Sequence, residues 1–131
     1  MRELPEWVVL RYGTLYGPGT WFGPDGARAA EARSGELVAG RDVSSFVHAD
    51  DAADAAVAAL DWPSGEVNIC DDEPAPGVSW VPAFAEECGG PAPPVDGEPP
   101  APWARGATNQ RARSELGWEP VHRSWRSGFF L

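Results

Sequence analysis

His48, Asp50 and Asp51 are the residues of this sequence whose types and spacing best suit proton transfer. An imidazole and a nearby carboxylate can act together as general acid and base, because histidine changes its charge near neutral pH. The same spacing also suits a second interpretation, in which Asp50 or Asp51 caps the following helix and a backbone hydrogen bond fixes the histidine. Both interpretations stay open, and His48 and Asp51 are our first candidate catalytic residues.

Histidine and carboxylate side chains are also metal ligands, and a second acidic group follows at Asp71, Asp72 and Glu73. Known zinc and calcium sites have characteristic ligand spacings. No such spacing joins His48 to this acidic turn, so the sequence predicts no metal site.

All ten basic residues of the chain are arginines, and the sequence therefore contains no lysine. A Schiff base, a phosphate-loop lysine and a Tyr-Lys proton relay each require that residue. None of these three devices can be built from the 131 residues alone.

The residues suited to proton transfer lie where a predicted strand meets the strongest predicted helix. Residues 44–48 predict a strand, and the alanine-rich stretch 51–60 predicts a helix. The apolar run 7–12 predicts a buried strand of a parallel sheet, followed by a turn at 16–19. Further elements are predicted as helices at 25–33, 78–88 and 108–116 and as strands at 36–39 and 66–70.

Length and charge restrict the class of protein. A chain of 131 residues and 14.0 kDa suits a single domain, 1–131. A net charge of −10 and a pI of about 4.5 argue against nucleic acid or an anionic membrane as partner. Met1–Glu6 is charged and lacks a signal-peptide core, and Cys70 and Cys88 do not make a disulfide framework. We therefore expect a cytoplasmic protein.

Residues 89–106 contain six prolines among 18 residues, which predicts a connector without helix or strand. Trp21, Trp62 and Trp103 lie in predicted loops. Their indoles either line a pocket or cover an apolar face.

Five sequence blocks follow one another along nearly the whole chain. They are LRYGTLYGPG at 10–19, SFVHADDAA at 45–53, GEVNICDDEP at 65–74, TNQRARSELGWEP at 108–120 and SWRSGF at 124–129. In this order they resemble the blocks LRxxxxYGPG, FVHVDDVA, GxxYNIxDDEP, SNxKAxxELGWxP and SWRxGF of the extended short-chain dehydrogenases/reductases, the NAD-dependent epimerase/dehydratase family. Each block alone is weak, but the ordered set is specific.

The resemblance implies the C-terminal, substrate-side portion of such a protein. The implied fold is α/β and partly Rossmann-like, with a small, mainly parallel sheet and about four helices, and it lacks the N-terminal dinucleotide-binding half. The glycine-rich turn that holds the cofactor pyrophosphate and the Tyr-x-x-x-Lys pair are both missing, and the stretch 17–23 has the wrong glycine spacing. Family members use NAD or NADP, and we expect no cofactor to bind this chain alone.

The resemblance also adds site residues. Relatives place the loop after the first strand beside the nicotinamide and the substrate, which makes Tyr16 a third candidate catalytic residue; a buried phenol is the alternative. In nucleotide-sugar relatives an arginine near Arg41 holds a substrate phosphate, with an ion pair as the alternative. We predict substrate contacts for Arg11, Tyr12, Trp21 and Arg41.

Three functional hypotheses follow. The first is a truncated or split epimerase/dehydratase-like protein that binds a small molecule, possibly like a nucleotide sugar, and lacks its own redox machinery. The second is a cofactor-independent cyclase or isomerase, and the third is a non-catalytic binding module. The apolar first strand and the apolar residues 129–131 need cover, so we expect a homo-oligomer or a complementing protein subunit.

Overall fold

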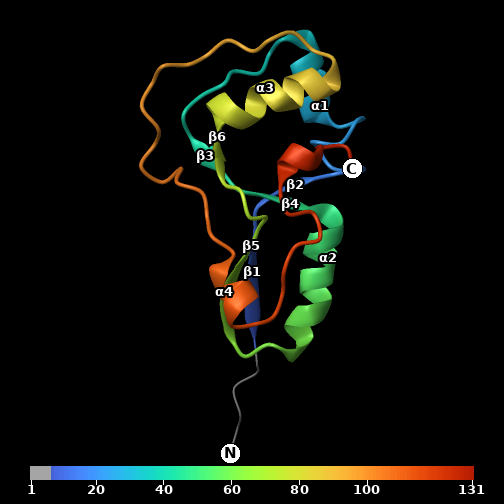
Figure 1. Cartoon of the computed structure of the whole chain (residues 1–131), viewed down its shortest axis with the longest axis vertical. Helices are drawn as coiled ribbons and strands as arrows, with labels where there is room; N and C mark the ends of the chain where they lie inside the picture. Colours follow the sequence, from blue (N-terminus) through green and yellow to red (C-terminus); the bar gives the residue numbers. More distant parts are fainter. Residues whose placement is uncertain (1–6) are drawn as a thin grey trace, which may run out of the picture.

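A computed structural model describes residues 7–131, so the expectation for Met1–Glu6 lies outside the described residues. The strands are β1 Val8–Tyr12, β2 Thr14–Tyr16, β3 Val43–Ser44, β4 Phe46–His48, β5 Gly65–Ile69 and β6 Ala75–Pro76. The helices are α1 Ala27–Ser34, α2 Ala49–Ala58, α3 Gly77–Cys88 and α4 Gln110–Ser114, with short 3-10 turns η1 Ala59–Asp61 and η2 Trp125–Ser127. Figure 1 shows β2 and β4 in the middle, with α1 and α3 at one end and β1, β5, α2 and α4 at the other.

The strands form three two-stranded sheets. β1 pairs with β5 in parallel, with Leu10 opposite Val67, and β2 pairs with β4 in parallel, with Tyr16 opposite His48. β3 and β6 pair antiparallel. The prediction of an α/β, partly Rossmann-like fold with a small, mainly parallel sheet and about four helices is confirmed, although the strands are divided among three two-stranded sheets.

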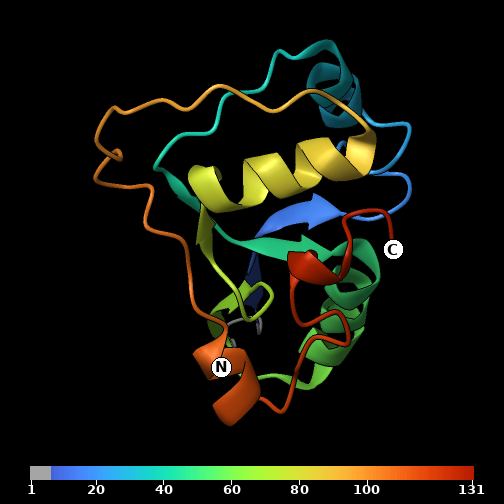
Figure 2. The same cartoon turned by 45° about the horizontal axis from the view of Figure 1, so that its top comes forward.

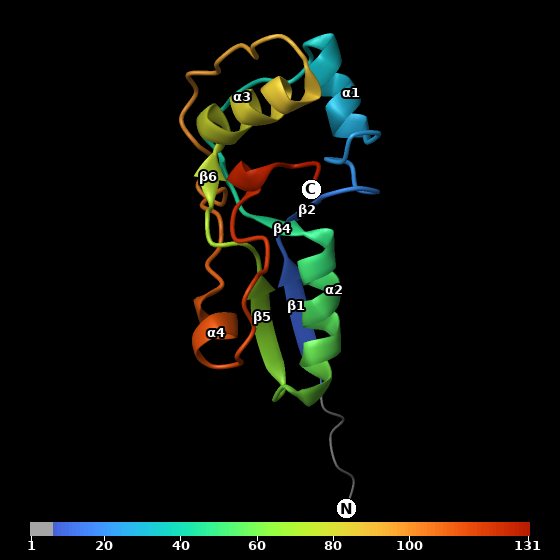
Figure 3. The same cartoon turned by 45° about the vertical axis from the view of Figure 1, so that its right-hand side comes forward.

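Strand β4 separates two apolar cores, because alternate side chains of a strand point to opposite faces. Phe46 enters an aromatic core under α1 and α3, whereas Val47 enters a second core between α2 and β5. Residues 118–129 then contact both cores, with Trp118 in the second and Trp125 and Phe129 in the first. Figure 3 shows this C-terminal segment passing between the two ends of the molecule.

Helix ends follow the local sequence. α1 and α3 end at Gly35 and Gly89, whose φ angles of 77° and 75° lie in the left-handed region that glycine adopts without a Cβ clash. α2 is built largely of alanine, the strongest helix former, and buries Asp51, Ala52 and Ala55 on one face.

One local prediction is wrong, and one strand was missed. The stretch 36–39 forms no strand, and only Ala39 makes an isolated bridge, to Val95 of the proline-rich segment. Strand β2 was not predicted, because three residues between two glycines are too few to show a periodicity.

Residues 89–106 run as an extended loop from α3 toward α4, which Figure 2 shows arching over the molecule. Among the described residues, no helix combines the length and apolarity that crossing a membrane requires.

Candidate functional site

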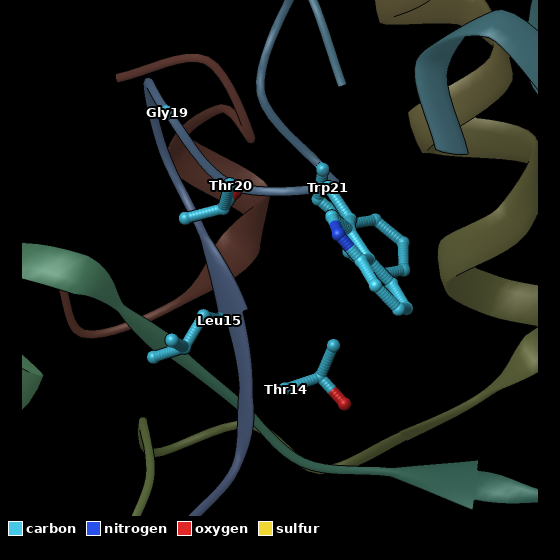
Figure 4. Close-up of a pocket in the computed structure, with 6 residues that line it drawn as sticks. Thr14, Leu15, Gly19, Thr20 and Trp21 are labelled. Carbon is cyan, nitrogen blue, oxygen red and sulfur yellow. The ribbon is translucent and has the colours of Figure 1, made fainter. Parts of the chain in front are cut away.

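A pocket of about 390 Å³ opens beside β2, and the loop that follows this strand forms its other wall. Its lining residues are Thr14, Leu15, Gly19, Thr20, Trp21 and Phe22. In Figure 4 the indole of Trp21 reaches back from the loop to the same space that Thr14 faces. Trp21 is 72% exposed, which leaves its ring face free for a ligand. The predicted substrate contact Trp21 therefore lies in a pocket.

Tyr16 lies in the aromatic core rather than at the surface. Its ring packs edge-on against Phe46 and Phe129 and lies 5.2 Å, centroid to centroid, from the ring of His48. Burial, together with the charges of Asp71 and Asp51, raises the pKa of the Tyr16 phenol. A phenol in this environment keeps its proton at neutral pH.

His48 caps helix α2, which corrects the prediction that Asp50 or Asp51 does so. The Asp50 N–H donates to Nδ1 of His48 at 3.0 Å. The second ring nitrogen, Nε2, is buried, and it finds no hydrogen-bond partner among residues 7–131. Nδ1 thus uses its lone pair to accept the helix-capping hydrogen bond.

Asp51 is buried and holds the C-terminal segment. Its two carboxylate oxygens each accept a backbone N–H at 2.9 Å, one from Val121 and one from His122. A carboxylate that accepts two amide hydrogen bonds can fasten a loop that has no secondary structure of its own. The structure thus brings Tyr16, His48 and Asp51 together in one buried region, and their catalytic role stays a prediction.

Two further carboxylates hold the same segment. Asp71 is 1% exposed and accepts the Trp125 N–H at 3.1 Å, and burial raises its pKa to about 7. Glu87 of α3 accepts the N–H groups of Phe129 and Phe130 at 2.7 and 2.9 Å. We call Asp51, Asp71 and Glu87 the clamp carboxylates. Sequence reasoning missed the roles of Asp71 and Glu87, although Asp71 lies in a motif that it identified.

The stacked imidazoles of His48 and His122 lie beside Asp50, with 3.8 Å between ring centroids and 11° between ring planes. Ligand atoms of the three residues lie within 4.8 Å of one another. The Nδ1 lone pair of His48 accepts the Asp50 N–H, however, so it does not point at a common ion. Parallel stacked rings also direct their lone pairs side by side instead of toward one centre. The geometry does not suit a metal.

The other predicted substrate contacts lie apart from the pocket. Arg11 forms an ion pair with Glu66 on the surface of the β1–β5 sheet. The Tyr12 hydroxyl donates to the Ala52 carbonyl at 2.9 Å, and Arg41 is exposed in the loop before β3. The structure does not bring Arg11, Tyr12 and Arg41 together with Trp21, and their substrate contacts remain predictions.

The segments that follow β4 and β5 do not fit the pyrophosphate of a dinucleotide. Such a site needs a glycine-rich turn between a strand and a helix N-terminus. After β4 this place is taken by His48, Asp50 and Asp51, and after β5 the acidic residues Asp71 and Asp72 follow. Carboxylates at these positions repel a phosphate.

Solved structures define the class. A UDP-glucose 4-epimerase of Thermus thermophilus, in complex with NAD, superposes with a TM-score of 0.64 and 27% identity over 92% of this chain and 44% of its own. A conserved protein of unknown function from Silicibacter pomeroyi gives 0.66 and 28% over 93% of this chain and 46% of its own. A dTDP-glucose 4,6-dehydratase of Bacillus anthracis shares the fold at 0.66 and 20% identity, over 93% of this chain and 42% of its own. The chain is a partial-length relative of NAD-dependent epimerases and dehydratases, as the resemblance to their C-terminal portion predicts.

A curated relative is more similar in sequence. A 3-diazoavenalumate denitrifying reductase of a Streptomyces species is 46% identical over 137 aligned residues, which cover 92% of this chain and 45% of the reductase. The chain thus spans about half the length of this relative. No family model matches the sequence.

Proposed function

We propose that this chain is the substrate-binding part of a reductase of the NAD-dependent epimerase/dehydratase class. In this proposal it holds a small aromatic molecule in the pocket beside β2. The observation that carries the proposal is the composition of that pocket, where Leu15, Trp21 and Phe22 offer apolar and aromatic surface and Thr14 and Thr20 offer hydroxyl groups.

Size and chemistry both favour a planar aromatic ligand. A space of about 390 Å³ is within the range of small-molecule sites, which are mostly apolar with a few polar groups that fix orientation. An exposed indole adds a stacking surface, and aromatic pairs contribute about 0.5–1.5 kcal/mol beyond their area. The match to a reductase named for 3-diazoavenalumate supports a reductase of a small molecule.

Charge argues against a nucleotide sugar in this pocket. Phosphates are bound by arginine forks, and none of the residues that line the pocket within the described chain is basic. Arg11 is paired with Glu66 instead.

In this proposal the described residues do not carry out hydride transfer. The sequence has no lysine for a Tyr-Lys pair, and the segments that follow β4 and β5 carry carboxylates where a dinucleotide needs glycines. The stretch 17–23 between β2 and α1 contains glycines, but their spacing differs from that of a dinucleotide site. NAD or NADP, when bound, would supply the hydride, and the part of the fold that holds it would come from a further polypeptide segment. This chain's own contribution is to bind and orient the substrate.

The proposal is tested by titrating the isotope-labelled chain with 4-coumarate, a small aromatic probe, and separately with UDP-glucose. We expect 4-coumarate to shift the indole N–H signal of Trp21 saturably, and UDP-glucose to leave it unchanged. Trp21→Ala should weaken 4-coumarate binding about tenfold, equivalent to about 1.4 kcal/mol. Trp103→Ala is the matched control, because Trp103 is 84% exposed in the proline-rich loop. Equal weakening by both variants, or saturation by UDP-glucose alone, would contradict the proposal.

A further inference from the structure

A second hollow, of about 380 Å³, adjoins the pocket beside β2. The two spaces share three wall residues, Gly19, Thr20 and Trp21, which Figure 4 shows on one continuous stretch of the loop after β2. The rest of the second wall is formed by residues 25–27, where helix α1 begins. A ligand that contacts Trp21 therefore has access to both spaces.

Backbone hydrogen bonds hold this shared wall in place. The N–H groups of Thr20, Gly23 and Gly26 each donate to the carbonyl three residues earlier, at 3.2, 3.0 and 3.1 Å. The Arg28 N–H donates to the Trp21 carbonyl at 3.0 Å, which fastens the start of α1 to the loop. A wall that is already ordered loses little conformational entropy when a ligand binds.

The only charge on the walls of the two hollows is negative. Asp25 is the one charged residue that lines either space in the described chain. Its carboxylate accepts no hydrogen bond from the start of α1, where no side chain caps the helix. No basic side chain of residues 7–131 forms an ion pair with it, and the arginine nearest in sequence, Arg28, is paired with Glu31 at 2.8 Å. Asp25 is thus available to meet a positive charge on a ligand.

A carboxylate next to an exposed indole suits a positively charged nitrogen. Cations are attracted to the face of an aromatic ring, and among side chains tryptophan attracts them most strongly. Trp21 belongs to both walls and is exposed, so it can contact an aromatic ring in one hollow and a cation in the other. The net charge of −10 adds a longer-range attraction for positively charged molecules. The two hollows together favour a ligand that has both an aromatic ring and a cationic group.

We propose that the second hollow is a subsite for the positively charged nitrogen of an aromatic ligand whose ring lies in the pocket beside β2. Asp25 supplies the opposite charge, and Trp21 contacts both parts of the ligand. The inference rests on the proposed function, because it places the ring in the same pocket. It narrows the ligand from small aromatic molecules in general to those that carry an ammonium or another cationic nitrogen group.

The test compares tyramine, a phenol with a protonated aminoethyl chain, with 4-propylphenol, which has the same size but no charge. Each is titrated into the isotope-labelled full chain, and the indole N–H signal of Trp21 reports binding. We expect Asp25→Asn to weaken tyramine binding about fivefold, through loss of an ion pair at an exposed site. The same variant should bind 4-propylphenol within about twofold of wild type, because this ligand brings no charge to the second hollow.

Asp54→Asn is the matched control, since Asp54 is exposed on α2 and lines neither hollow. It removes the same net charge as Asp25→Asn and should leave tyramine binding within about twofold. Equal weakening of tyramine by both variants would show attraction by net charge alone and would overturn the inference. No weakening by Asp25→Asn, or equal weakening for both ligands, would overturn it as well.

The subsite and the aromatic pocket can fail separately. Saturable binding of 4-propylphenol at Trp21, with no effect of Asp25→Asn on tyramine, would refute the subsite and leave the proposed function standing. If neither ligand shifts the Trp21 signal, the pocket does not bind aromatic molecules and both proposals are refuted. Thermal melts of each variant confirm that it is folded, and we expect an unchanged Tm because both aspartates are exposed.

Discussion

Replacing Asp51 distinguishes a carboxylate that holds the C-terminal segment from one that caps a helix. The side chain is 1% exposed, and its two oxygens accept the N–H groups of Val121 and His122, both at 2.9 Å. Asp51→Ala removes both hydrogen bonds, and Asp51→Asn keeps one because its amide nitrogen cannot accept. A helix cap would tolerate asparagine, since Asn and Asp cap equally well.

The magnitude follows from the two bonds. A hydrogen bond to a charged group contributes about 1.5–3 kcal/mol, so Asp51→Ala should lose about 3–6 kcal/mol and Asp51→Asn about 2 kcal/mol. These are large fractions of a total stability of about 5–15 kcal/mol. In a domain of this size 1 kcal/mol moves Tm by roughly 3–6 °C, so the alanine variant should melt about 10–35 °C lower.

Urea unfolding monitored by tryptophan fluorescence measures these losses, with Asp54→Ala as the matched control. Asp54 lies on the exposed side of the same helix and should cost at most about 0.5 kcal/mol. An Asp51→Asn variant within about 0.5 kcal/mol of wild type would refute the reasoning and restore the capping interpretation.

Three further predictions concern the same region. Burial raises the pKa of Asp71 from 3.8 to about 7, so ionising this carboxyl group is less favourable in the folded state than in the unfolded state. The free energy of unfolding is therefore highest below about pH 4, where Asp71 is protonated in both states. It falls by roughly 4 kcal/mol at most as the pH rises to about 7. The difference in unfolding free energy between wild type and Asp71→Asn, measured from pH 4 to 8, should decrease through that window, and a difference independent of pH would contradict this. Gly17→Ala should lower the free energy of unfolding by about 3 kcal/mol, because φ is +107° and the new Cβ would lie 2.7 Å from Nε2 of His48. Gly19→Ala is the control: its φ is +87° but the Cβ meets open space, so it should lose only about 1–2 kcal/mol. Thermal melts of both variants measure the difference. Glu87→Gln should lower the free energy of unfolding by about 1–2 kcal/mol in urea titrations, because one of its two hydrogen bonds from backbone N–H groups is lost. The amide hydrogens of Phe129 and Phe130 should then exchange faster. Unchanged exchange at these two amides would show that Glu87 does not hold the segment.

Periodic segments were predictable from sequence, and contacts between distant residues were not. The apolar run that forms most of β1 predicts a strand, and the alanine-rich composition of α2 predicts a helix, without reference to the rest of the chain. β2 has three residues, too few for a pattern, and residues 36–39 have the composition of a strand but pair only through one bridge, at Ala39.

The candidate site divides in the same way. The sequence singled out Tyr16, His48 and Asp51 as candidate catalytic residues. It did not predict that Asp51 binds the backbone of Val121 and His122, which lie 70 and 71 positions further along the chain. These hydrogen bonds join a side chain to backbone N–H groups. Because every residue except proline has the same backbone N–H, no sequence pattern marks the ones that Asp51 binds. The pocket beside β2 was missed except for Trp21, because a pocket depends on how a loop returns to its strand.

The clamp carboxylates also set an order of events during synthesis. The amides that they bind lie 70, 54 and 42 residues beyond Asp51, Asp71 and Glu87, so each carboxylate leaves the ribosome well before its partner. Until residues 121–130 emerge, the nascent chain keeps these charges hydrated and leaves open the aromatic core that Trp125 and Phe129 complete. Contacts of such long separation form slowly, because a large loop must close first. The growing chain therefore exposes the apolar surface of this core until residues 121–130 pack against it.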